Sequence, residues 1–127
     1  MNKNLSVLVV DDYPPLANAV AQILHIKGLE VQTANSGSEA LHILIAHPVD
    51  VLLTDVMMPD MTGLELYRAT KKIYTPVIAI LMSAFAPEDL LRQGMAEGVR
   101  AVLDKPLDIN FLMALFSTLK GSDSLAI

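Results

Sequence analysis

The stretch VDVLLTDVMMPD, residues 49–60, combines an apolar strand with an acid at its end. Val51 to Thr54 is apolar enough to lie inside a protein, and it leads directly into Asp55. An apolar run without alternation is typical of a strand that is covered on both faces, as in the centre of a parallel sheet. The rest of the chain must explain why such a strand carries a carboxylate at its own end.

The composition restricts the class of protein. The chain has 127 residues, a net charge of −5, 53% hydrophobic residues and no cysteine. These values predict one α/β domain without disulfides, in the cytoplasm, and with no direct contact to nucleic acid. The longest apolar run, 76–87, is too short for a membrane span, which needs about 18 residues. Acids follow the short N-terminal apolar patch, so we expect no signal peptide.

Strand and helix patterns alternate along the whole chain. Apolar, β-branched runs predict five strands, at 5–10, 30–34, 49–55, 76–83 and 100–104. Helical spacing, caps and glycine stops predict five helices, at about 14–27, 36–47, 62–72, 87–97 and 108–120. Ser36 and Glu39 have the spacing of a capping box, in which each side chain accepts a backbone N–H of the other residue.

Five successive strand–helix units predict a parallel sheet with helices on both faces, a three-layer sandwich. Parallel strands need crossover connections, and these are right-handed. In such sheets the functional site lies beyond the carboxyl ends of the strands, where the strand order reverses. The acid at the end of the third strand therefore lies where a site is expected.

Reactive side chains follow four of the predicted strands. Asp11 and Asp12 follow the first strand, Asp55 ends the third, Ser83 ends the fourth and Lys105 follows the fifth. Clustered carboxylates repel one another unless a cation lies among them, and a set of oxygen ligands suits Mg²⁺. The ammonium and the hydroxyl would then bind a phosphoryl group, and one carboxylate could accept it as an aspartyl phosphate.

Each of these residues, taken singly, also fits an ordinary structural role. Asp11 and Asp12 suit a solvated turn before a helix, and Asp55 suits a strand-ending cap. Ser83 suits a turn, and Lys105 suits an exposed position. The combination at one edge of the sheet favours the metal and phosphoryl site, because the structural roles do not require the residues to meet.

Four motifs together resemble the response regulator receiver domain of two-component signalling. They are VLVVDD (7–12), LLTDVMMPDMTGLEL (52–66), MSA (82–84) and DKP (104–106). The resemblance covers about residues 5–119. It implies a flavodoxin-like (βα)5 fold with strand order 2-1-3-4-5, a receiver domain at 1–120 and a tail or linker stub at 121–127.

The resemblance implies a phosphoacceptor at Asp55. The phosphoryl group would come from the phosphohistidine of a sensor histidine kinase or a phosphotransfer protein. Asp11, Asp12, Asp55 and the backbone carbonyl of Met57 would hold Mg²⁺.

Further roles follow from the same resemblance. Ser83 would be the switch hydroxyl, and Ala84 would be the small residue that leaves room for the phosphoryl group. Lys105 would be its counter-ion, and the bond between Lys105 and Pro106 would be cis.

Four positions are expected to modulate the switch: Met57, Phe85, Val102 and Pro106. Receiver domains often carry Tyr or Phe where this chain has Val102, so the usual aromatic part of the switch is absent; Phe85 is a candidate substitute. Met57 and Phe85 should flank the phosphoryl site with apolar groups that hinder an attacking water. We therefore expect slow self-dephosphorylation.

The predicted last helix is apolar on more than one face. Ile109, Leu112, Phe116 and Leu119 form one core stripe, and Phe111 and Met113 lie off it. These two residues either pack under a neighbouring helix or meet a partner. The receiver family uses its fourth helix, fifth strand and fifth helix as a partner surface, which allows a homodimer.

The resemblance implies a phosphoacceptor switch rather than an enzyme with turnover. A phosphatase of the haloacid dehalogenase type also uses an aspartate at a strand end, but it needs a second Asp two residues later, where this chain has Met57. A receiver that has lost phosphorylation and serves only for docking is the other alternative.

Overall fold

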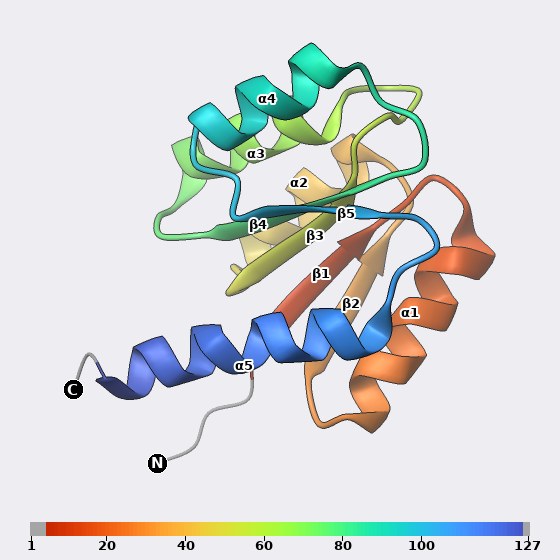
Figure 1. Cartoon of the computed structure of the whole chain (residues 1–127). Coiled ribbons are helices and arrows are strands. Elements are labelled where there is room, and N and C mark those ends of the chain that lie inside the picture. Colours follow the sequence, from red (N-terminus) through yellow and green to blue (C-terminus); the bar gives the residue numbers. More distant parts are fainter. Residues whose placement is uncertain (1–4, 126–127) are drawn as a thin grey trace.

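The computed structural model describes residues 5–125, with side chains described as far as residue 119. Strands and helices alternate along this part of the chain (Figure 1). The strands are β1 (Ser6–Val10), β2 (Glu30–Ala34), β3 (Val51–Asp55), β4 (Ile78–Ser83) and β5 (Ala101–Asp104). The helices are α1 (Pro14–Ile26), α2 (Gly37–Ala46), α3 (Gly63–Ile73), α4 (Glu88–Ala96) and α5 (Ile109–Leu125).

The strands form one parallel sheet in the order β2-β1-β3-β4-β5, as predicted. All five residues of β3 are buried, whereas β2 alternates towards solvent as an edge strand should. The sheet order reverses between β1 and β3, since the chain first adds β2 on one side of β1 and then β3 on the other. The flavodoxin-like fold class is confirmed.

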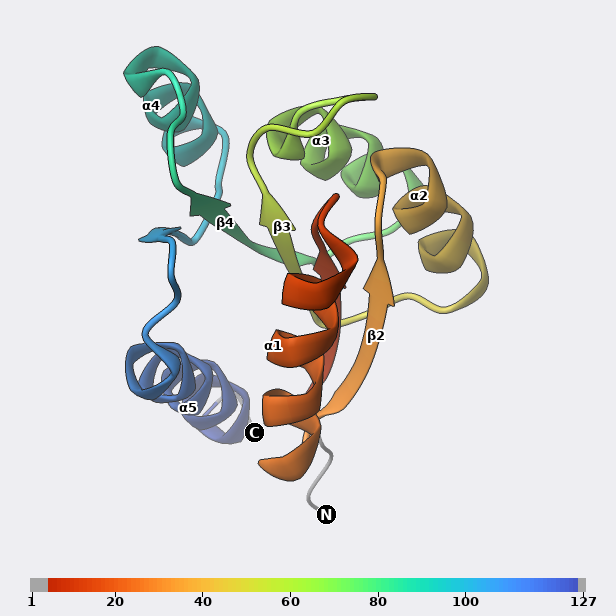
Figure 2. The same ribbon diagram turned by 90° about the vertical axis from the view of Figure 1, so that its right-hand side faces the viewer.

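Helices cover both faces of the sheet (Figure 1, Figure 2). The strand pleat sends Leu52 to the face covered by α2, α3 and α4, and Leu53 to the face covered by α1 and α5. The predicted stripe of α5 faces the sheet, with Leu112, Phe116 and Leu119 buried.

The start of α2 and the end of α5 differ from the sequence prediction. Ser36 accepts the N–H of Glu39 (3.0 Å) as expected, but the Glu39 carboxylate accepts the N–H of Asn35 (2.5 Å) instead of that of Ser36. The complete capping box lies at the start of α3, between Thr62 and Glu65.

The helix α5 continues past its predicted end at Lys120 to Leu125. A single glycine costs a helix only about 1 kcal/mol, so Gly121 does not have to end it. The expected tail at 121–127 therefore begins inside α5, and residues 126–127 lie outside the described part of the chain. No helix within residues 5–125 is both long and apolar enough to cross a membrane.

Candidate functional site

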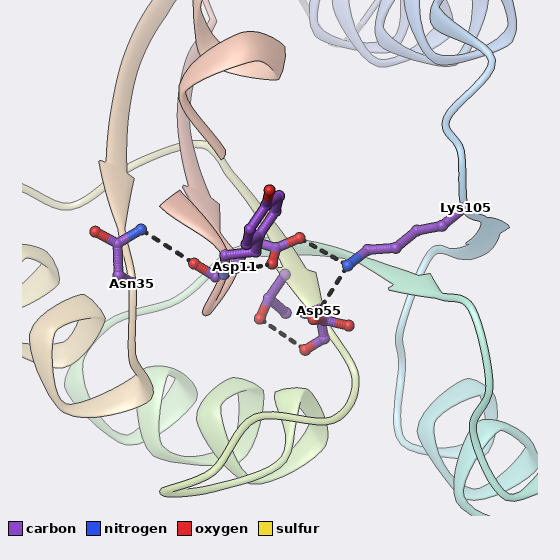
Figure 3. Close-up of polar contacts among 6 residues, drawn as sticks. Asp11, Asn35, Asp55 and Lys105 are labelled. Atoms are coloured by element: carbon purple, nitrogen blue, oxygen red, sulfur yellow. Dashed lines mark hydrogen bonds and ion pairs between the residues drawn. The ribbon is translucent and has the colours of Figure 1, made fainter. Parts of the chain in front are cut away.

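Three charged side chains from distant parts of the sequence meet at the carboxyl end of the sheet (Figure 3). The Nζ atom of Lys105 lies 2.7 Å from Oδ2 of Asp11 and 3.1 Å from Oδ2 of Asp55. Asp11 is 1% exposed and Asp55 is 8% exposed. The ammonium therefore bridges two buried carboxylates, as the sequence-based grouping required.

The register of the sheet brings these residues together. Val10 is paired with Thr54, so the residues that follow them, Asp11 and Asp55, emerge side by side. On the other side, Ser83 is paired with Asp104, and the backbone N–H of Lys105 donates to the carbonyl of Ser83 (3.0 Å). The site is thus positioned by the ends of β1, β3, β4 and the edge strand β5 rather than by long loops.

The loop after β3 folds back tightly on the end of that strand. The N–H of Gly63 donates to the carbonyl of Val56 (2.7 Å), and Met57 pairs with Thr62 in an isolated antiparallel bridge. A Cβ atom at position 63 would overlap the backbone carbonyl oxygen of Asp55. Only glycine allows α3 to begin this close to the acidic centre.

A third carboxylate completes the acidic cluster. Asp11, Asp12 and Asp55 each offer one oxygen, and these oxygens lie within 4.8 Å of one another. Asp12 is exposed and the other two are buried, so the cluster is open on one side. Oxygen ligands with an open side fit Mg²⁺, which keeps several waters when it binds to protein. The backbone carbonyl of Met57 as a further ligand stays a prediction.

The electrostatics of the site also favour a cation. Burial raises the pKa of Asp55, the hydrogen bond and charge of Lys105 lower it, and the charges of Asp11 and Asp12 raise it; the net effect is a raised pKa. Burial lowers the pKa of Lys105, but its hydrogen bonds to Asp55 and Asp11 outweigh burial and raise it overall. One ammonium does not fully compensate three carboxylates.

The switch residues predicted from the resemblance lie at the same edge of the sheet. Ser83 ends β4 and is 7% exposed, and Ala84 follows it at an exposed position. The bond between Lys105 and Pro106 is cis, as the resemblance implied. The roles of these residues in switching remain predictions.

The predicted modulating residues are more exposed than the charged centre. Met57 is 46% exposed and Phe85 is 93% exposed, so the Phe85 ring contacts little of the protein. Val102 is half-buried and lines a surface hollow of about 290 Å³ together with Pro106 and Phe111. The place of the usual aromatic residue is therefore a hollow beside α5.

The two residues of α5 that lay off its predicted core stripe have different environments. Met113 is partly buried against the core on the side of α1 and α5. Phe111 is 55% exposed. Packing under neighbouring residues therefore accounts for Met113, and Phe111 stays available to a partner.

Two residues near the site were not singled out from the sequence. The Asn35 side chain donates from Nδ2 to the backbone carbonyl of Asp11 (3.1 Å). The Asp60 carboxylate accepts the backbone N–H groups of Gly37 (3.1 Å) and Ser38 (2.9 Å). Both contacts join residues more than 20 positions apart, and a local sequence pattern carries no signal of them.

The chain belongs to the response regulator receiver domain family, whose model matches residues 7–117. It is 33% identical over 113 residues to the sensor histidine kinase RcsC of Escherichia coli, covering 87% of this chain and 12% of that protein. It is 37% identical over 108 residues to the response regulator receiver protein Anae109_2439 of Anaeromyxobacter, covering 85% of this chain and 45% of that protein. The chain thus spans less than half the length of these relatives.

Solved structures share the fold. The CheY-like receiver domain protein of Methanospirillum hungatei superposes with a TM-score of 0.90 at 23% identity, covering 98% of this chain and 100% of that one. The chemotaxis protein CheY4 of Vibrio cholerae gives a TM-score of 0.82 at 30% identity, covering 91% and 98% of the two chains. The fold and the family are those expected from the four motifs.

Proposed function

We propose that this receiver domain accepts a phosphoryl group on Asp55 in a Mg²⁺-dependent reaction. The donor would be the phosphohistidine of a sensor histidine kinase or of a phosphotransfer protein. The observation that carries the proposal is the ammonium of Lys105, held between the carboxylates of Asp11 and Asp55. This arrangement puts a nucleophile and a counter-charge for the phosphoryl oxygens at one point.

The proposed step is a direct transfer. A carboxylate oxygen of Asp55 attacks the phosphorus, and a P–O bond forms as the P–N bond of the donor breaks. The imidazole leaves with the electron pair of that bond. Lys105 neutralises charge on the phosphoryl oxygens. Ser83, at the end of the neighbouring strand, donates a hydrogen bond from its hydroxyl to one of these oxygens.

The residues that would hold Mg²⁺ are Asp11, Asp12 and Asp55, with the backbone carbonyl of Met57. The acidic cluster supports this set, since its three carboxylates lie within 4.8 Å of one another. The ion would supply positive charge to the phosphoryl oxygens when it is bound. Asp11 and Asp12 then act as ligands, and Asp55 is both ligand and nucleophile.

We further propose that phosphorylation biases a two-state equilibrium of the loops after β3 and β4. Ser83 and Ala84 stand at the start of the second loop, next to the site. The surface formed by α4, β5 and α5 would then change for a downstream effector or for a second copy of the chain. The exposed Phe111 ring on α5 supports such a contact.

The proposed role is that of a switch in the cytoplasm, which is phosphorylated and dephosphorylated without turning over a separate substrate. The position two residues after Asp55 holds Met57, which cannot be the general acid of a dehalogenase-type phosphatase. Loss of the phosphorylation chemistry is not favoured either, because Asp11, Asp55 and Lys105 are in contact.

The direct test is intact-mass measurement after incubation with Mg²⁺ and acetyl phosphate. We expect one added phosphoryl group on the wild-type protein, and none in Asp55→Asn or in samples treated with EDTA. No adduct under conditions in which Mg²⁺ binding is measured by calorimetry would refute the proposal. It would leave docking without phosphorylation as the function.

A further inference from the structure

The start of α2 contacts both loops that carry the proposed Mg²⁺ ligands. The first loop follows β1 and contains Asp11 and Asp12; the second follows β3 and contains Met57. The segment between them in space, residues 35–38, contributes no ligand of its own. Its contacts nevertheless link the two loops to each other.

The tip of the loop after β3 is tied to α2 through polar contacts. The carboxylate of Asp60 accepts the backbone N–H of Gly37 (3.1 Å) with Oδ1, and the N–H (2.9 Å) and hydroxyl (3.1 Å) of Ser38 with Oδ2. Three donors from one helix start therefore converge on one side chain. These hydrogen bonds lower the pKa of Asp60, so the carboxylate is charged at neutral pH.

An apolar contact reinforces the same link. A Cβ atom at Gly37 would overlap the side chain of Met61, so the loop lies directly on the helix start. At its base the loop is closed by the bridge between Met57 and Thr62. Because both base and tip are held, the position of the Met57 carbonyl depends on where α2 begins.

The segment before α2 also holds the loop after β1. The Asn35 side chain donates from Nδ2 to the carbonyl of Asp11 (3.1 Å), as Figure 3 shows. The N–H of Asn35 is in turn bound by the Glu39 carboxylate of α2 (2.5 Å), and the N–H of Asp11 donates to the carbonyl of Ala34 (3.1 Å). The loop after β1 is thus also fixed to this corner.

We propose that residues 35–38 form a bracket that sets the spacing between the two ligand-bearing loops, with Asn35 and Asp60 as positioning residues for Mg²⁺. The inference rests on the proposed function. Mg²⁺ requires near-ideal octahedral geometry, so a small displacement of one loop weakens binding. Residues that orient metal ligands typically change affinity by about 10- to 100-fold when they are replaced.

The experiment compares Asp60→Ala and Asn35→Ala with a matched control, Asp50→Ala. Asp50 lies at the opposite end of the sheet, and its Oδ2 accepts the N–H (2.9 Å) and hydroxyl (3.1 Å) of Ser6. It therefore makes the same pair of contacts as Asp60 makes with Ser38, but far from the acidic cluster. The Asp60→Asn variant keeps one of the two acceptor oxygens and should therefore lose less affinity than Asp60→Ala.

Three measurements test the variants. Calorimetric titration with Mg²⁺ should show about tenfold weaker binding for Asp60→Ala and Asn35→Ala, and wild-type affinity for Asp50→Ala. Hydrogen exchange of the metal-free proteins should show faster exchange at the N–H groups of Gly37 and Ser38 in Asp60→Ala. Phosphorylation by acetyl phosphate should need more Mg²⁺ in both bracket variants but reach the wild-type rate at saturation.

The outcomes separate this inference from the function on which it rests. If both bracket variants bind Mg²⁺ as tightly as wild type although exchange at residues 37 and 38 is faster in Asp60→Ala, the bracket is refuted and the proposed function stands. An equal loss of affinity in Asp50→Ala would also refute it, since the effect would then follow from stability alone. If the wild-type protein binds no Mg²⁺, both inferences fail.

Discussion

An aspartate stands at each end of the central strand β3: Asp50 immediately precedes the strand and Asp55 is its last residue. The surroundings of these two residues differ in kind. At the amino end, Asp50 accepts two hydrogen bonds from Ser6 and meets no charged partner in them. At the carboxyl end, Asp55 meets an ammonium and two further carboxylates. The same residue type therefore accepts hydrogen bonds from neutral donors at one end of the strand and lies in a cluster of charges at the other.

The difference shows how the surroundings prepare one carboxylate for the proposed phosphorylation and the other for a structural contact. Neutral donors of Ser6 bind the Asp50 carboxylate and tie the residue before β3 to β1, so these hydrogen bonds stabilise the folded state. Asp55 is buried beside like charges, so its ionised form is held at an energetic cost, which the raised pKa reflects. A bound cation or a transferred phosphoryl group would relieve this energetic cost at Asp55. No such cost has to be relieved at the amino end of the strand.

The largest effect should come from removing the only ammonium that contacts the acidic cluster in the described chain. We expect Lys105→Met to slow phosphorylation of Asp55 by acetyl phosphate about 100-fold, the usual result of deleting one group that stabilises a transition-state charge. The rate is measured by intact mass over time. Lys71→Met is the control, because Lys71 also binds the protein, at the carbonyl of Glu97 (3.2 Å), but outside the site. Equal rates in the two variants would contradict the role of Lys105.

Replacement of Asp50 and replacement of Asp55, at the two ends of β3, should change stability in opposite directions. Asp50→Ala leaves the N–H and hydroxyl of Ser6 without their acceptor, so we expect the free energy of unfolding to fall by about 2 kcal/mol. Asp55→Asn removes a buried charge from a cluster of like charges. Without divalent cations, the free energy of unfolding should therefore rise by about 1 kcal/mol at neutral pH. Urea denaturation measures both.

The pH dependence identifies the cause of the second change. The pKa of Asp55 in the folded protein lies above its ordinary value of 3.8, so between these two pKa values the folded state binds more protons than the unfolded state. The contribution of Asp55 to stability is therefore complete below pH 3.8 and is lost as the pH rises through the folded pKa. The gain of Asp55→Asn should vanish in acid. A gain that persists there would assign the effect to packing instead.

The smallest effect concerns the residues around the reactive end. We expect Met57→Asn and Phe85→Glu to shorten the lifetime of the phosphorylated protein severalfold, because a polar side chain can orient an attacking water. Met57 should have the larger effect, since Phe85 is 93% exposed and contacts little of the protein. The lifetime is followed by intact mass after the phosphoryl donor is removed. Unchanged lifetimes in both variants would refute the expectation of slow self-dephosphorylation.

Much of the site was predictable because its residues stand at the ends of strands that are recognisable from composition. Asp11, Asp55 and Ser83 each follow an apolar run, and a parallel sheet brings such ends to one edge. The contacts of Asn35 and Asp60 were not predicted, because both residues lie in loops. Their partners are set by how α2 sits against two neighbouring loops, and no local period encodes that arrangement.

The sequence by itself determined the alternation of strands and helices, the burial of β3 and the family of the protein, since these follow from local hydrophobic patterns and from motifs of a few residues. The tertiary structure alone decided which atoms meet. Lys105 and Asp11 are 94 positions apart, and their 2.7 Å contact requires the strand order and register of the whole sheet. The pKa of Asp55 likewise depends on burial and on three neighbouring charges, and only folding buries this residue and brings those charges next to it.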